Sequence, residues 1–167
     1  GNTPLMIEDW TRDIPFFMPI DTFSATHKIR SFLVIQNDSI KYQYYNDKIN
    51  ENELHSSYSV AKSFTSSLVG IALKNGDISS LNDSVSKYIV GLKGSVYDDV
   101  TIRQLLTMTS GVDWNEDYTD PNSDVAKFNF HKAQNDLPTI VSYMRGLSRA
   151  QPPGEKWHYS TGETNLI

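Results

Sequence analysis

Two β-rich runs lie next to each other in this sequence, and no further strands follow that could accompany them. Residues 31–36 and 39–45 are rich in β-branched and aromatic side chains, and Asn37-Asp38 between them is a typical turn pair. They predict a β-hairpin. Because an isolated hairpin is marginal in water, we expect its sheet to be completed from elsewhere or covered by a helix.

The sequence after the hairpin is mostly helical. A helix is expected from Ser59 to Lys74, with Asn75-Gly76 as its C-terminal stop, and its small and apolar residues predict close packing all round. Thr101 and Gln104 form a capping-box pattern for another helix, which Gly111 is expected to end. Shorter helices are expected over residues 83–89, 123–130 and 137–145, the last with Asp136 as its N-cap.

The chain divides into three stretches. Residues 1–30 form an N-terminal wrapping segment, irregular over 1–28 because prolines break its periodicity around scattered aromatic residues such as Trp10. Residues 31–58 contain the hairpin of the sheet, and 59–167 contain the first long helix and a helical region. Residues 164–167 read as the start of an apolar helix, so we expect the chain to stop inside a larger fold.

The composition excludes several classes of protein. Fifteen Lys and Arg against 20 Asp and Glu give a net charge of −5, and 38% hydrophobic residues are typical of a folded chain. No basic cluster suggests nucleic-acid binding, and no apolar stretch approaches the roughly 20 residues of a membrane span. Without cysteine there is no disulfide or thiolate metal site; the compartment stays open, including export with a removed signal peptide.

Ser59 and Lys62 form an S-x-x-K motif where a helix is expected to begin. Residues three apart on a helix share one face, about 5–6 Å between Cβ atoms, so the Lys62 amine can reach the Ser59 hydroxyl. A serine becomes nucleophilic when a base takes its proton, and a lysine does this when burial or positive potential lowers its pKa. The alternative is a plain N-cap serine beside a solvated lysine.

Tyr159 follows the tight turn at residues 152–154, and a phenol beside a lysine can relay a proton. Its alternative is a core aromatic with a bonded hydroxyl. A Ser-His-Asp triad is less favoured because no G-x-S-x-G elbow is present. We therefore expect structural or exposed roles for most of the histidines, which are His27, His55, His131 and His158.

Residues 113–124 form an acidic loop, in which Ca²⁺ binding is the alternative to simple solvation. The spacing is not that of an EF-hand, which favours a solvated, turn-rich loop. The loop and its surroundings also contain aromatic residues that either line a pocket for an apolar acyl group or belong to the core. These are Trp114, Tyr118, Phe128 and Phe130.

Three motifs occur in one order: S-V-A-K at 59–62, TIRQLLTMTSG at 101–111 and PGEKWHYS at 153–160. Together they resemble the class C β-lactamase-related serine hydrolases, a family that also includes esterases and penicillin-binding D-amino peptidases. Residues 111–125 resemble the branch that contains the nylon-oligomer (6-aminohexanoate) hydrolases and related amidases and esterases. The resemblance covers about residues 30–167.

The resemblance implies an α+β fold of the serine β-lactamase/transpeptidase type, with an antiparallel sheet flanked by helices and a helical region. It implies Ser59 as acylated nucleophile, Lys62 as its base and Tyr159 as proton relay. Tyr118 matches a substrate-contacting loop tyrosine. Thr161 stands where the family has Asn in Tyr-x-Asn, a substrate-binding position, so the contact with β-lactams is expected to differ.

The predicted function is hydrolysis of a small-molecule amide or ester through a Ser59 acyl-enzyme, without metal or organic cofactor. Trp114 joins Tyr118 and Thr161 as a candidate substrate-binding residue. The C-terminal strands of the family, one of which supplies half of the oxyanion hole, are expected from the rest of the protein or another chain. The alternatives are a binding or sensing module that is acylated with little turnover, and a helical interaction fragment.

Overall fold

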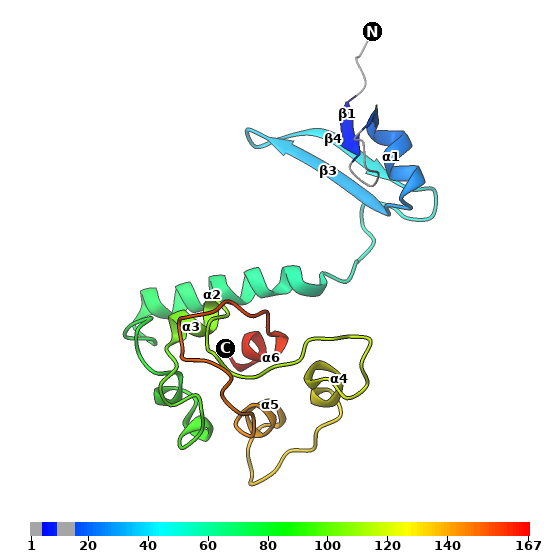
Figure 1. The fold of residues 1–167 in the computed structure, drawn as a ribbon. Helices are drawn as coiled ribbons and strands as arrows, with labels where there is room; N and C mark the ends of the chain where they lie inside the picture. The colour runs from blue at the N-terminus through cyan, green and yellow to red at the C-terminus, as the bar shows by residue number, and fades with distance from the viewer. Residues whose placement is uncertain (1–4, 10–15) are drawn as a thin grey trace. The chain divides into compact units, whose positions relative to one another are not determined.

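The predicted hairpin is present where the sequence indicates it. Strand β3 (Ser31–Gln36) pairs antiparallel with β4 (Ser39–Tyr45). Asn37 and Asp38 form the turn with φ of 50° and 55°, in the left-handed region that two-residue hairpin turns require. The computed structural model describes residues 5–9 and 16–167, and within them the hairpin is a two-stranded sheet of its own (Figure 1).

Regular elements also precede the hairpin, so the prediction of an irregular segment over residues 1–28 is wrong. β1 (Met6–Asp9) pairs antiparallel with β2 (Phe16–Pro19), and α1 (Ile20–Thr26) follows directly. Pro19 is compatible with this order because proline is tolerated at the end of a strand and at a helix start, where its missing N–H is not needed. Three of the residues behind that prediction, Pro4, Trp10 and Pro15, lie outside the described residues.

All these elements belong to a compact unit that ends at Ser56, and a second compact unit covers Ser57–Ile167. The second unit begins with a 3₁₀ turn, η1 (Tyr58–Val60), which leads into α2 (Ala61–Asn75). Gly76 ends α2 with a φ of 84°, as predicted. The α-helix starts two residues later than expected, since Tyr58 has a φ of 44° and Ser59 lies in the 3₁₀ turn.

The expectation that α2 is packed all round is wrong. Val69 is its buried residue, whereas Phe64, Leu68 and Ile71 are exposed. Figure 1 shows α3 (Ile102–Leu106) and α6 (Thr161–Leu166) along one flank of α2. Small side chains permit close approach, but an apolar face is buried only where another element packs on it.

The core of the second unit lies among short helices, and no described residue from 57 on belongs to a β-strand. Between α2 and α6 the elements are η2 (Val85–Lys87), η3 (Val90–Leu92), α3, α4 (Asp124–Phe128) and α5 (Thr139–Met144). They bury a common cluster of side chains that includes Leu92, Tyr97, Val100, Leu105, Trp114, Phe128, Met144 and Leu166. No helix in the described part of the chain is both long and apolar enough to span a bilayer.

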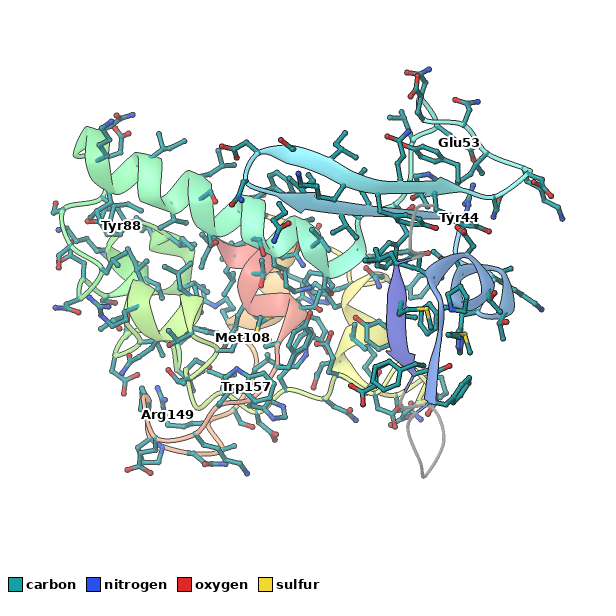
Figure 2. The ribbon with its side chains drawn as sticks, turned by 90° about the horizontal axis from the view of Figure 1, so that it is seen from above. Tyr44, Glu53, Tyr88, Met108, Arg149 and Trp157 are labelled. Carbon is teal, nitrogen blue, oxygen red and sulfur yellow. The ribbon has the colours of Figure 1, made fainter. Side chains whose placement is uncertain are left out.

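Capping chemistry sets some helix boundaries as predicted. Thr101 accepts a hydrogen bond from the Gln104 N–H, and Gln104 Oε1 accepts one from the Thr101 N–H, which completes the capping box of α3. Ser123 caps α4 by accepting from the Ala126 N–H at 3.2 Å. Tyr88, labelled in Figure 2, donates across η2 to Asp83 at 2.6 Å.

Other boundaries differ from the predictions. The helix expected over 83–89 is replaced by the 3₁₀ turn η2, and η3 follows just beyond that range. Asp136 is not an N-cap: α5 begins only after Pro138, because a residue before proline is disfavoured in the α conformation. α3 ends at Leu106 rather than at Gly111, whose left-handed φ of 72° instead allows a close approach to another segment.

That close approach pairs residues 108–111 with residues 150–158. Gly111 O accepts hydrogen bonds from the Ala150 and Gln151 N–H groups at 2.9 and 3.0 Å. Further along, Met108 O accepts from the His158 N–H at 2.8 Å, and Figure 2 labels Met108 and Trp157 in this region. The pairing fixes the backbone that carries the next residue of the chain, Tyr159.

Candidate active site

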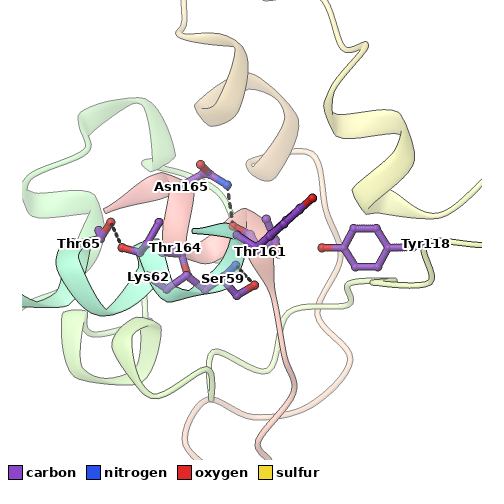
Figure 3. A pocket seen from close by; sticks show the side chains of 9 residues that line it. Ser59, Lys62, Thr65, Tyr118, Thr161, Thr164 and Asn165 are labelled. Carbon is purple, nitrogen blue, oxygen red and sulfur yellow. Dashed lines mark hydrogen bonds between the residues drawn. The ribbon is translucent and has the colours of Figure 1, made fainter. Parts of the chain in front are cut away.

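Ser59 and Lys62 are in contact, as their spacing predicts. The Lys62 ammonium donates a hydrogen bond to Ser59 Oγ at 3.1 Å across the junction of η1 and α2 (Figure 3). Ser59 is not the N-cap of α2, because that position belongs to Val60, which makes no side-chain capping bond. The alternative of a plain N-cap serine with a solvated lysine does not describe this site.

Tyr159, near the C-terminal end of the second unit in the sequence, also contacts Ser59 Oγ. Its hydroxyl donates to Ser59 Oγ at 2.7 Å, although the two residues are 100 positions apart. The His158 ring, on one side of Tyr159 in the chain, lies 2.5 Å from Trp114 O, and Ser160 on the other side caps α6 by accepting from the Glu163 N–H. Tyr159 is therefore held between two anchored neighbours with its hydroxyl on Ser59.

The position of Lys62 favours ionisation of Tyr159. Burial raises the pKa of the Tyr159 phenol, but the hydrogen bonds with Ser59 and Lys62 and the positive charge of Lys62 outweigh it. The net result is a pKa below the ordinary value of 10.0. The Lys62 Nζ also lies 5.2 Å from the centroid of the Tyr159 ring. The Ser59 hydroxyl, the Lys62 amino group and the Tyr159 phenol thus form one hydrogen-bonded group.

A cavity of about 320 Å³ opens beside Ser59 and Lys62. Figure 3 shows the side chains that line it. Tyr118 is one of its walls, with 72% of its surface exposed, and Thr161 at the start of α6 is another. The lining residues are Tyr58, Ser59, Ala61, Lys62, Thr65, Tyr118, Thr161, Thr164 and Asn165. Most of the lining side chains end in a hydroxyl, amide or amino group that can hydrogen-bond a ligand.

Trp114, by contrast, does not line this cavity. It is 3% exposed and packs edge-on against Phe128 and Tyr143, with ring centroids 6.1 and 6.4 Å away. Its place is in the core, which is the second of the two roles considered for it. Its indole N–H is directed at Glu116.

Glu116 is the residue of this region that sequence reasoning missed. The sequence places Glu116 in a loop that is expected to be solvated. In the structure it accepts four hydrogen bonds from three residues. The donors are Trp114 Nε1, Tyr118 OH at 2.8 Å, Thr161 N at 2.9 Å and Thr161 Oγ1 at 2.5 Å. The Trp-x-Glu-x-Tyr spacing is the only sequence signal that could have indicated it. No group of His, Asp and Glu among the described residues could hold a metal ion.

The histidines form no catalytic triad among the described residues. His27 pairs with Asp9 in the first unit, and His55 is exposed. His131 Nε2 lies 3.0 Å from Ser142 Oγ, but no described carboxylate bonds its other ring nitrogen. The His158 ring contacts a backbone atom, Trp114 O, so this contact is a structural one.

A family model described as "Beta-lactamase" matches residues 20–167. The chain belongs to the beta-lactamase family. It is 36% identical over 95 residues to a 6-aminohexanoate-dimer hydrolase of Paenarthrobacter ureafaciens, covering 57% of this chain and 24% of that protein. It is 29% identical over 144 residues to a beta-lactamase of Pseudomonas fluorescens, covering 82% of this chain and 36% of the relative. The chain thus spans about a quarter to a third of the length of these relatives.

Solved structures show the same fold. A Bacillus anthracis protein provisionally described as a 6-aminohexanoate-dimer hydrolase superposes with a TM-score of 0.75 at 24% identity, over 90% of this chain and 41% of that one. A class C beta-lactamase in complex with cefoxitin gives a TM-score of 0.64 at 24% identity, over 88% and 40%. The predicted family resemblance and the β-lactamase-like fold are confirmed.

Proposed function

We propose that this chain carries the catalytic serine of a hydrolase that cleaves an amide or ester bond through a Ser59 acyl-enzyme. The observation that supports it most is the convergence of Lys62 Nζ and Tyr159 OH on Ser59 Oγ, at 3.1 and 2.7 Å. A serine held by two groups that can exchange a proton, at the edge of a cavity, is the arrangement that nucleophilic catalysis requires.

Acylation starts once the Lys62 ammonium has lost a proton to solvent; the neutral amine then takes the Ser59 proton while Ser59 Oγ attacks the substrate carbonyl. The tetrahedral intermediate collapses when the C–N or C–O bond breaks, and the leaving group takes a proton from the Tyr159 hydroxyl. Lys62 returns the proton to Tyr159, 5.2 Å from its ring centroid. In deacylation, water attacks the ester, its proton passes through Tyr159 and Lys62, and Ser59 Oγ recovers it.

An amide is the better-supported substrate class. The Paenarthrobacter relative is named for an amide-linked dimer, and the Pseudomonas relative for cleavage of a lactam. The cavity walls offer hydroxyl and amide groups from Tyr118, Thr164 and Asn165, which can hydrogen-bond a substrate amide. The backbone N–H of Ser59 is one candidate donor to the oxyanion.

Covalent labelling of the full protein tests the nucleophile. A fluorophosphonate should add one adduct mass on the peptide that contains Ser59, and Ser59→Ala should abolish it. Ser63→Ala, a change one helical turn further along α2, is the matched control and should label normally. An adduct elsewhere contradicts the assignment, whereas labelling without hydrolysis of any amide or ester favours the binding or sensing module.

A further inference from the structure

Glu116 is a carboxylate whose bonding partners are all neutral. Its four hydrogen bonds come from an indole, a phenol, a backbone N–H and a threonine hydroxyl, and the described residues give it no ion-pair partner. Burial raises the pKa of Glu116, but these donors outweigh the effect and hold the pKa below its ordinary value. The carboxylate is therefore a fixed negative charge beside the cavity.

The partners of Glu116 come from two parts of the chain that meet at the cavity. Tyr118 is the exposed wall residue, and the Glu116 carboxylate holds its hydroxyl at 2.8 Å. Thr161 stands two residues after Tyr159, and both its N–H and its hydroxyl are bonded to Glu116. Glu116 thus connects the loop that carries Tyr118 to the start of the helix behind Tyr159.

The charge of Glu116 also acts on Tyr159 directly. Lys62 on α2 and Glu116 on the loop are the charged groups that face the phenol; Lys62 lowers its pKa and Glu116 raises it. The neighbouring Tyr118 hydroxyl is bonded to Glu116, and the His158 ring to Trp114 O. Lys62 and Glu116 thus act on the pKa of the Tyr159 phenol in opposite directions, and the effect of Lys62 is the larger.

We propose that Glu116 is a positioning residue, which fixes Tyr118 and the start of α6 at Thr161 around Ser59 and sets a negative charge against that of Lys62 at Tyr159. This inference rests on the proposed function, because it assigns the charge to the proton relay of that site. The Thr161 hydroxyl, at the position where the family has Asn, donates to Glu116.

Replacing Glu116 by Gln in the full protein tests the electrostatic part without any need for turnover. Gln keeps the size and an acceptor oxygen but removes the charge. We expect the phenolate absorbance of Tyr159, isolated as the difference from the same variant with Tyr159→Phe, to titrate at lower pH than in the parent. Asp117→Asn is the matched control: it removes a charge from the same loop, where Asp117 bonds to Thr119, and should leave the titration unchanged.

Kinetics test the positioning part. In Glu116→Gln, kcat/KM for an amide substrate should fall by about 10- to 100-fold, and the limb of the pH–rate profile that Tyr159→Phe abolishes should move to lower pH. Thr161→Val, which keeps the charge and removes one donor, should lower kcat/KM without moving that limb, and remains testable if Glu116→Gln does not fold.

An unchanged Tyr159 titration in Glu116→Gln, or an equal shift in Asp117→Asn, overturns the inference. A parent protein that is inactive on every amide and ester contradicts the proposed function instead. The titration shift would then still support the electrostatic role of Glu116.

Discussion

Lys62 lies three residues after Ser59 and bonds its hydroxyl, so the role of Lys62 can be tested by a single truncation. Lys62→Met keeps the aliphatic stem and removes the amine that bonds Ser59 Oγ. We expect the rate of acylation to fall by about 10²–10⁴-fold, the range for loss of general-base catalysis. The measurement is the burst or labelling rate with an activated ester in the full protein.

The matched control for this change is Lys74→Met, in the last turn of the same helix. It should acylate at the parental rate. If Lys62→Met also acylates at that rate, another group activates Ser59, and Tyr159 as the phenolate would be the first candidate because its pKa lies below its usual value.

Glu163 should make the stability of the protein depend on pH. Its side chain is 2% exposed, Ser110 bonds one carboxyl oxygen, and the other has no hydrogen-bond partner among the described residues. Burial raises the pKa of Glu163 from 4.5 to about 7. Because the folded state holds the proton more tightly than the unfolded state, this stabilisation is complete below pH 4.5 and is lost as pH rises through 7.

We therefore expect Glu163→Gln to unfold at nearly the same temperature as the parent near pH 4.5 and at a clearly higher one near pH 8. The difference in unfolding free energy should be on the order of 3 kcal/mol. Thermal unfolding of the full protein at both pH values measures it. Parallel pH dependences in parent and variant would show that Glu163 is not the group responsible.

For individual residues, the sequence predicts contacts between positions close in the chain and misses contacts between distant positions. The contact between Ser59 and Lys62 follows from a spacing of three residues. The contact between Ser59 and Tyr159 follows from no spacing, and only the family resemblance indicated it. Glu116 was missed because an acidic loop normally faces water, and nothing in its composition shows that four neutral donors from three residues converge on one carboxylate.

Among the elements, the pairing of residues 108–111 with 150–158 holds the backbone before Tyr159, and Gly111 is the position in it that tolerates substitution least. A Cβ at Gly111 would lie 2.0 Å from Gln151 O, in addition to the strain of a φ of 72°. We expect Gly111→Ala to destabilise the protein by at least about 3 kcal/mol, since neither backbone can move without breaking the pairing. Denaturant unfolding measures the loss.

Gly94→Ala separates the two causes. Gly94 has nearly the same φ, 74°, but nothing lies within 4 Å of the added Cβ. At Gly94 the strained backbone conformation alone should lower the free energy of unfolding by about 1–2 kcal/mol. Equal losses in the two variants would mean that residues 150–158 yield easily, and that the pairing does not hold Tyr159 in place.

The elements that the sequence predicted best have their determinants within a few residues of each boundary. Asn37-Asp38 sets the hairpin turn, Gly76 ends α2, and Thr101 with Gln104 starts α3. The failures have a different origin. α1 follows a proline that marks a helix start as readily as a break, and the exposure of α2 depends on which elements pack against it.

For the whole molecule, the exposed apolar surface and the net charge lead to opposite expectations about solubility. The net charge of −5 favours solubility, but each unit exposes an apolar face. In the first unit this face includes Leu33, Ile35 and Ile40 of the hairpin, and in the second Phe64, Leu68 and Ile71 of α2. Contiguous patches of this kind on an isolated polypeptide promote association.

We therefore expect residues 1–167, expressed alone, to self-associate and to hydrolyse p-nitrophenyl esters slowly or not at all. Sedimentation velocity across a range of concentrations measures the first property and a spectrophotometric assay the second. Leu68→Lys should weaken association because it places a charge in the apolar face of α2, whereas Asn122→Lys, the same charge gain in an exposed loop, should not. A monodisperse monomer that unfolds cooperatively and shows Ser59-dependent turnover would contradict the prediction. The apolar faces would then be stable in contact with water, and the site around Ser59 would act without a further hydrogen-bond donor to the oxyanion.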